Sequence, residues 1–158
     1  MIPRSGLLTL TAFLTLPLLA PSAAAGGGES VRVSVVAVLA SEKGKDAVID
    51  PRLKCIAREI RKKDPKLNNF RLGRMTCQSV PVGEENKFTL VKDQAVTVTV
   101  DRGADERSHV VLRVTAPGLR EITYKTCCGK FLLIQTPYRA ENNEILFLAV
   151  RVQPCNGK

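Results

Sequence analysis

Two adjacent cysteines, Cys127 and Cys128, carry the most readily named chemistry of this chain. They stand in the stretch K-T-C-C-G-K, with Lys125 and Lys130 on either side. Nearby cations favour the thiolate, which is the nucleophilic form in thiol–disulfide exchange. The pair therefore suggests a thiol-based redox protein as one function.

Cysteine usage also favours a purely structural role. Thiol–disulfide enzymes usually carry Cys-x-x-Cys at a helix N-terminus, and no such pair occurs in the sequence. Its absence also disfavours a zinc site, so we expect no metal. An exported chain with an odd number of cysteines favours two disulfides and one free thiol. The sequence leaves the pairing open among Cys55, Cys77, Cys127, Cys128 and Cys155.

Catalytic residues are otherwise scarce. His109 is the single histidine, so any Cys-His or Ser-His-Asp arrangement has to include it. It follows a charged loop, and the simplest interpretation is a solvated residue at a strand end. The sequence contains no G-x-S-x-G, no H-E-x-x-H and no glycine-rich dinucleotide loop. We therefore assign no catalytic residue and no cofactor, and favour a protein that is not an enzyme.

A basic helix face is the strongest candidate for binding. Apolar residues at helical spacing predict one buried stripe over 50–63, and cationic residues occupy the outward side, with Glu59 as the one acid among them. The candidate face for an anionic partner consists of Lys54, Arg58, Arg61 and Lys62. Sequence-specific binding of nucleic acid is not expected, because aromatic residues that stack on bases are few.

The N-terminal segment has the layout of a secretory signal peptide. Arg4 precedes a broken apolar run over 7–19, and Ala23-Ala24-Ala25 supplies small residues for cleavage. Cleavage after Ala25 predicts an exported protein, periplasmic or extracellular, without a transmembrane segment after processing. Residues 1–25 contain one basic and no acidic residue, so the net charge falls from +9 to +8. Such a charge favours anionic partners in general and also keeps a protein soluble.

The remaining 133 residues are enough for one domain with one core. Residues 26–30 form a glycine-rich leader, 31–153 a single domain and 154–158 a C-terminal tail. Within the domain, the valine-rich run 31–40 predicts a buried strand, and Asp50-Pro51 predicts a helix start through an N-cap and a proline at the first helical position.

Short alternating segments dominate the rest of the domain. They predict strands over 70–77, 87–91, 95–100, 109–115 and 144–152, and a β-hairpin over 121–136 with its corner at Cys127-Cys128-Gly129-Lys130. The predicted fold class is α+β: a mainly antiparallel or sandwich-like β-meander with one amphipathic helix packed on it.

This layout resembles a group of uncharacterised exported bacterial α+β domains. The residues that carry the resemblance are Asp50-Pro51-Arg52-Leu53, Val80-Pro81-Val82-Gly83, Cys128-Gly129 and the run 144–150. The resemblance implies an α+β or sandwich-like domain and carries no assigned activity.

The sequence thus favours a non-catalytic exported domain that binds an envelope or extracellular component, an anionic one in particular. The partner is an unknown protein or an anionic polymer. The alternative is a thiol-based redox protein that uses Cys127 and Cys128.

Overall fold

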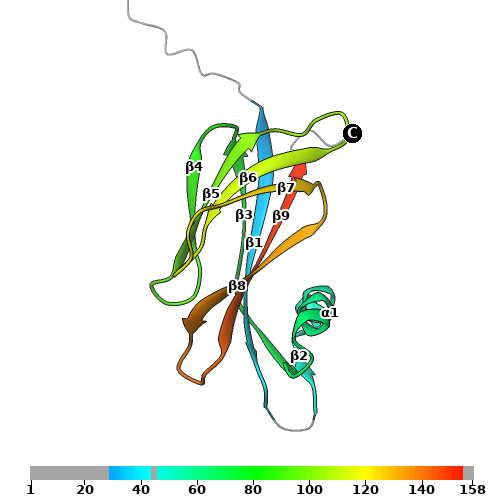
Figure 1. Cartoon of the computed structure of the whole chain (residues 1–158), viewed down its shortest axis with the longest axis vertical. Helices are drawn as coiled ribbons and strands as arrows, with labels where there is room; N and C mark the ends of the chain where they lie inside the picture. The colour runs from blue at the N-terminus through cyan, green and yellow to red at the C-terminus, as the bar shows by residue number, and fades with distance from the viewer. Residues whose placement is uncertain (1–28, 44–45, 155–158) are drawn as a thin grey trace, which may run out of the picture.

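The computed structural model describes residues 29–43 and 46–154, which form two β-sheets and one helix (Figure 1). The predicted signal peptide, most of the predicted leader and Cys155 lie outside these residues. The elements are β1 (Ser30–Ser41), β2 (Val48–Ile49), a 3-10 turn (Pro51–Leu53), α1 (Lys54–Lys63), β3 (Asn69–Pro81), β4 (Glu85–Thr89), β5 (Ala95–Arg102), β6 (His109–Thr115), β7 (Ile122–Cys127), β8 (Phe131–Arg139) and β9 (Ile145–Pro154).

The strands form a sandwich of two sheets. The large sheet has the order β2-β3-β1-β9-β8, and the small sheet has the order β4-β5-β6-β7. All neighbours are antiparallel except β2 and β3, which pair in parallel over two residues. The predicted fold class, β-dominated α+β with largely antiparallel sheets and one helix, is therefore confirmed. The small sheet is a meander, whereas the large sheet joins strands from both ends of the domain.

β1 is covered on both of its faces along 35–40. Its odd-numbered residues, such as Val35 and Leu39, belong to the core between the two sheets. Its even-numbered residues Val36, Val38 and Ala40 belong to a second cluster beneath α1. The valine-rich run is the expected composition of a strand that is buried on both sides, and this prediction is confirmed.

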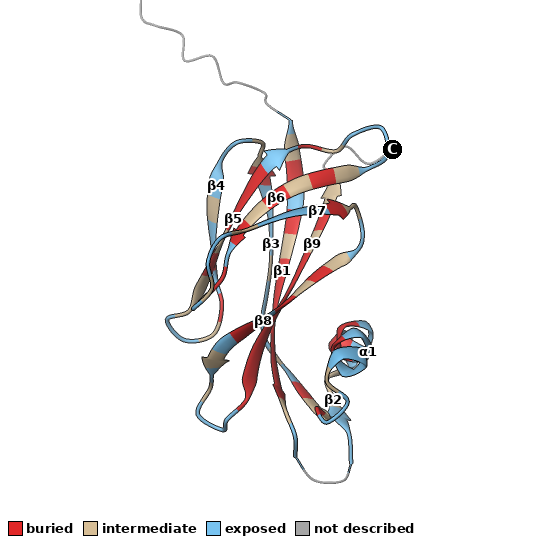
Figure 2. Cartoon of the chain, in the orientation of Figure 1, coloured by how far each residue is buried: buried red, intermediate tan, exposed pale blue. Residues whose placement is uncertain are grey.

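α1 packs on the outer face of the large sheet. Its buried residues Ile56, Ala57 and Ile60, with Leu53 of the preceding turn, contact the second cluster. Figure 2 shows the buried positions of α1 toward the sheet and the exposed positions away from it. The Asp50 carboxylate accepts a 2.9 Å hydrogen bond from the Arg52 amide, and Pro51 follows, so the predicted helix start is confirmed. In the described ranges no helix is long and apolar enough to cross a membrane.

The predicted hairpin over 121–136 is wrong. β7 pairs with β6, and β8 pairs with β9, so the two strands belong to different sheets. At the corner between them, the Cys128 amide donates to Ser108 O at 2.8 Å, and the next amide, that of Gly129, donates to Val152 O at 2.9 Å. Gly129 has a φ of +86°, which a side chain would disfavour. The chain therefore changes sheets between residues 128 and 129.

Candidate functional site

The four residues of the predicted basic face lie around one surface hollow. Lys54, Arg58, Arg61 and Lys62 line it together with Ile49 of β2 and Pro65, and its volume is about 560 Å³. We call this site the basic hollow. The cationic side chains are exposed and follow helical spacing along α1. Of the two apolar residues, Ile49 precedes the helix in the chain and Pro65 follows it. The arrangement suits an anionic group with an apolar portion beside it.

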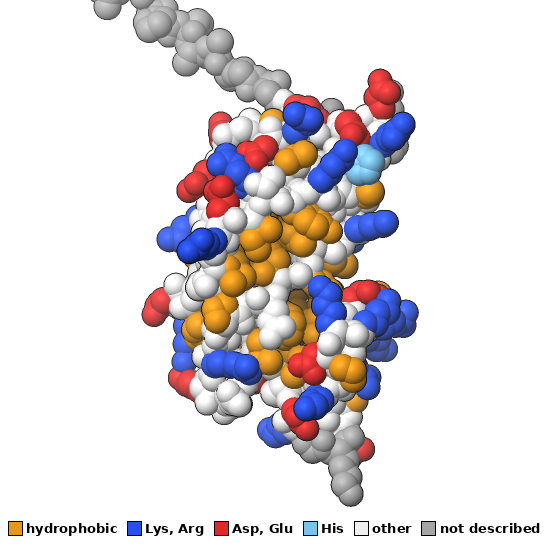
Figure 3. All heavy atoms as spheres, viewed as in Figure 1, with side chains coloured by type: hydrophobic (Ala, Val, Ile, Leu, Met, Phe, Trp, Pro, Cys, Tyr) orange, Lys and Arg blue, Asp and Glu red, His pale blue; other side chains and the backbone are white. Residues whose placement is uncertain are grey.

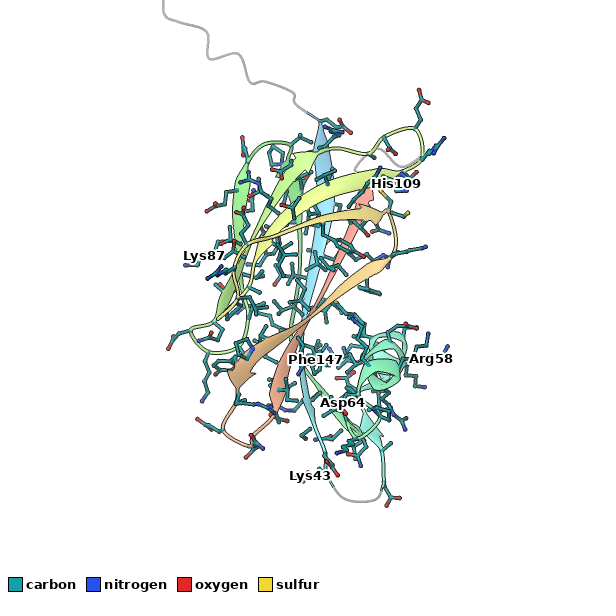
Figure 4. The ribbon with its side chains drawn as sticks, viewed as in Figure 1. Lys43, Arg58, Asp64, Lys87, His109 and Phe147 are labelled. Carbon is teal, nitrogen blue, oxygen red and sulfur yellow. The ribbon has the colours of Figure 1, made fainter. Side chains whose placement is uncertain are left out.

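The charge of the basic hollow is only slightly compensated. None of its lining residues is acidic. Lys62 pairs with Glu59 at 2.6 Å on the helix surface, whereas Lys54, Arg58 and Arg61 have no ion pair within the part of the chain that the structure describes. Figure 3 shows blue side chains gathered over α1, and in Figure 4 the Arg58 side chain points away from both sheets.

Helix stability explains only half of this cationic face. Arg61, Lys62 and Lys63 occupy the last turn, where the helix dipole favours positive charge. Lys54 occupies the first turn, where the dipole disfavours it, and no acid is present there. Lys54 and Arg58 are also like charges four residues apart, which costs roughly 0.2–0.5 kcal/mol. These two cations are therefore the better evidence for a binding role.

The four described cysteines are free thiols. Cys55 on α1 is exposed, as its position on the helix predicts, and Cys77 on β3 is exposed and accepts a hydrogen bond from the Ser34 hydroxyl at 3.3 Å. Because Cys155 lies outside the described residues, disulfide formation stays a prediction.

The adjacent cysteines differ in their surroundings. Cys128 packs against the core between the sheets. Burial, followed by the proximity of Cys127, raises the pKa of the Cys128 thiol. The expectation that Lys125 and Lys130 favour a thiolate is therefore wrong for Cys128. Cys127 is half-buried at the end of β7 and belongs to the outer face of the small sheet.

His109 is not simply solvated. It begins β6 directly opposite Cys127 in the β6–β7 register, and its Nδ1 lies 3.4 Å from Asp105 Oδ2. Its side chain is 28% exposed. The structure thus places the one histidine opposite Cys127 on the neighbouring strand, an association that the sequence analysis missed. The tight turn over 105–109 could have indicated only the approach of Asp105 to His109, since Asp105 is suited to capping the turn.

A second hollow, which we call the end cleft, lies where the β4–β5 turn faces the β8–β9 connection. It measures about 510 Å³ and includes Leu39 and Leu90 of the core, and Arg71 with Glu144. Lys92 of the turn pairs with Glu141 of the β8–β9 connection. Lys92 is therefore not an isolated charge, although its position in a turn of the sequence suggests one. Sequence analysis did not identify this cleft, because four separate segments form it.

No group of three or more His, Cys, Asp and Glu within residues 29–43 and 46–154 could hold a metal ion. No protein-family model, curated protein or solved structure matches this chain. The resemblance to exported bacterial domains thus stays a prediction.

Proposed function

We propose that this protein is a non-catalytic exported domain that binds an anionic envelope or extracellular component through the basic hollow of α1. The observation that carries the proposal is the convergence of Lys54, Arg58, Arg61 and Lys62 on one hollow without an acidic lining residue. Exposed cations attract anions over about 10 Å at moderate salt, and their effects add when they surround one point.

The packing of α1 also supports a binding role. Leu53, Ile56 and Ile60 anchor the helix in the second cluster, so the backbone beneath the cationic side chains is held on the large sheet. A fixed set of charges loses less conformational freedom on binding than a mobile one. Ile49 and Pro65 add apolar surface at the edge, which distinguishes the hollow from a uniformly charged helix face.

The test compares two double charge reversals of equal size. Arg58→Glu with Arg61→Glu changes the basic hollow, and Lys43→Glu with Lys87→Glu changes exposed lysines outside it. Figure 4 shows Lys87 on the opposite side of the molecule from Arg58. Poly-L-glutamate is the anionic probe, and binding is measured by surface plasmon resonance from low to physiological salt.

We expect the wild-type protein to bind the probe with an affinity that falls steeply as salt rises. The reversal in the basic hollow should weaken binding at least tenfold more than the control reversal. Equal losses in both variants would show that diffuse charge, and not this hollow, attracts the probe. Circular dichroism melting of each variant checks that the fold is kept.

A further inference from the structure

We propose that Cys127 is a reactive thiol that exchanges with low-molecular-weight disulfides, with His109 as its proton partner and Asp105 as the positioning residue. This chemistry is separate from the basic hollow. Of the two adjacent cysteines, Cys127 is the one that attacks the disulfide.

Backbone pairing brings the thiol and the imidazole together. His109 and Cys127 are partners in the β6–β7 register. The flanking Cys128 amide donates to Ser108 O, so His109 and Cys127 form a non-hydrogen-bonded pair of an antiparallel ladder. In such pairs the Cα atoms are about 4.5 Å apart and the side chains approach most closely. Because Val110 and Thr126 are buried, both side chains lie on the outer face of the small sheet.

Two backbone hydrogen bonds hold the Asp105 carboxylate beside the imidazole. Its Oδ1 accepts hydrogen bonds from the amides of Arg107 at 2.9 Å and His109 at 2.7 Å. The His109 amide is the main cause of a lowered pKa for the Asp105 carboxyl group, which keeps it charged. Its Oδ2 lies 3.4 Å from His109 Nδ1, an atom that is shielded from solvent and has no hydrogen-bond partner among the described residues. A carboxylate beside this nitrogen helps to fix the orientation of the imidazole ring.

The exchange reaction balances without a further oxidant. His109 takes the proton of Cys127, and the resulting thiolate attacks one sulfur of the small disulfide. The bond between the two reagent sulfurs breaks as the bond to Cys127 Sγ forms. The leaving thiolate then takes the proton from His109. Cys127 is oxidised to a mixed disulfide, and half of the reagent is reduced to a thiol.

A small hollow beside His109 is lined by charges of both signs. Asp105, Glu106, Arg107, His109 and Lys125 line a hollow of about 310 Å³ at this corner. Its two acids and two bases balance when His109 is neutral. The imidazole is visible at the surface in Figure 3, between basic side chains. The half-buried Cys128 contributes a second thiol, and burial raises the pKa of that thiol, which lowers the share of its reactive thiolate form.

The first experiment uses single-thiol proteins, in which four cysteines are replaced by Ser and one is kept. The reagent is 4,4′-dithiodipyridine, which is uncharged at pH 7, so that attraction by surface charge does not contribute. Cys77 is the comparator, because it is a strand thiol that is more exposed than Cys127, so exposure alone would make Cys77 the faster of the two. We expect the protein that keeps Cys127 to react about tenfold faster at pH 7 than the protein that keeps Cys77, since a general base beside the thiol can take its proton during the attack. Equal rates would overturn the proposal.

The second experiment removes the proton partner. His109→Gln should slow the Cys127 reaction about fivefold or more and shift its pH profile upward, without changing the Cys77 rate. Asp105, Glu106, Arg107 and Lys125 remain in both proteins, and residue 128 is Ser in both, so the difference reports His109. If the single-thiol proteins fail to fold, the same comparison is made in Cys128→Ser by competitive alkylation and mass spectrometry. An unchanged Cys127 rate, or a Cys127 already disulfide-bonded in protein purified without reductant, contradicts the proposal.

Discussion

Arg71 and Glu144 lie 73 positions apart in the chain, and their side chains form a two-point ion pair in the end cleft. Arg71 Nη2 is 2.7 Å from Glu144 Oε2, and Arg71 Nε is 3.3 Å from Glu144 Oε1. The Glu144 side chain is 5% exposed, whereas that of Arg71 is 56% exposed. The arginine therefore satisfies a buried carboxylate from the solvent side and links β3 to the start of β9.

Removing the arginine should destabilise the fold by leaving this carboxylate without its partner. We expect Arg71→Leu to lower the free energy of unfolding by roughly 1–3 kcal/mol, measured by urea denaturation, because an unpaired buried charge is costly. The double variant with Glu144→Leu should regain much of the loss, since no charge is then stranded. Arg74→Leu on the same strand is the control and should have a small effect. Additive losses in the double variant would contradict this account.

The approach of Val91 to Gly73 gives a second stability prediction. A Cβ atom at residue 73 would lie 2.5 Å from Val91 Cγ1, far inside normal contact distance. Gly73→Ala should therefore lower the free energy of unfolding by about 1–3 kcal/mol through overpacking. Combination with Val91→Ala should relieve most of that loss, and a thermodynamic cycle by urea denaturation measures the coupling. Absence of coupling would mean that backbone effects at Gly73 dominate.

A third prediction separates binding from stability at Lys54. Lys54→Glu places an acid in the first turn of α1 and an opposite charge four residues before Arg58. We expect the free energy of unfolding to rise by about 0.5 kcal/mol while affinity for poly-L-glutamate falls. Urea denaturation and surface plasmon resonance measure the two effects, and Lys87→Glu supplies a matched charge change outside the hollow. Parallel losses of stability and affinity would argue against the basic hollow.

A fourth prediction concerns the pH dependence of the α1 start. Side-chain hydrogen bonding to Arg52, followed by the Arg52 amide, lowers the pKa of Asp50. A lowered folded-state pKa means that the carboxylate stabilises the fold above its unfolded pKa of about 3.9 and loses this effect as the pH falls through the folded value.

The stability difference between wild type and Asp50→Ala should accordingly be full at pH 7 and shrink below about pH 4. Thermal melts across this range measure it. The variant Asp50→Asn keeps a capping oxygen, so it should be less destabilised than Asp50→Ala at pH 7. A difference that persists unchanged at pH 2 would show that the charge of Asp50 is not involved.

Local patterns were sufficient for the elements that carry their own signal. The run 31–40 has the composition of a strand with two covered faces, and Asp50-Pro51 marks a helix start by its own backbone chemistry. The cationic face of α1 also follows from spacing alone, since four residues of one helix share a side whatever lies around them. These features depend on neighbours close in the chain.

Features made by distant segments were not predictable in the same way. A hairpin and a sheet-changing corner both place a glycine turn between two alternating strands, so β7 and β8 looked like partners. The pairing of Arg71 with Glu144 and the meeting of His109 with Cys127 depend on strand order and register. The periodicity of one sequence predicts neither strand order nor register. It indicates which face of a sheet a residue occupies, but not which strand lies beside it.

The corner at Cys128 and Gly129 has a consequence for how the two sheets open. Its consecutive amides donate to opposite sheets, so each reports on a different one in native-state hydrogen exchange. The Cys128 amide exchanges when the small sheet releases Ser108, and the Gly129 amide exchanges when the large sheet releases Val152. Equal protection of these two amides from exchange would identify the sandwich as one cooperative unit. Unequal protection would show which sheet opens at the lower free energy.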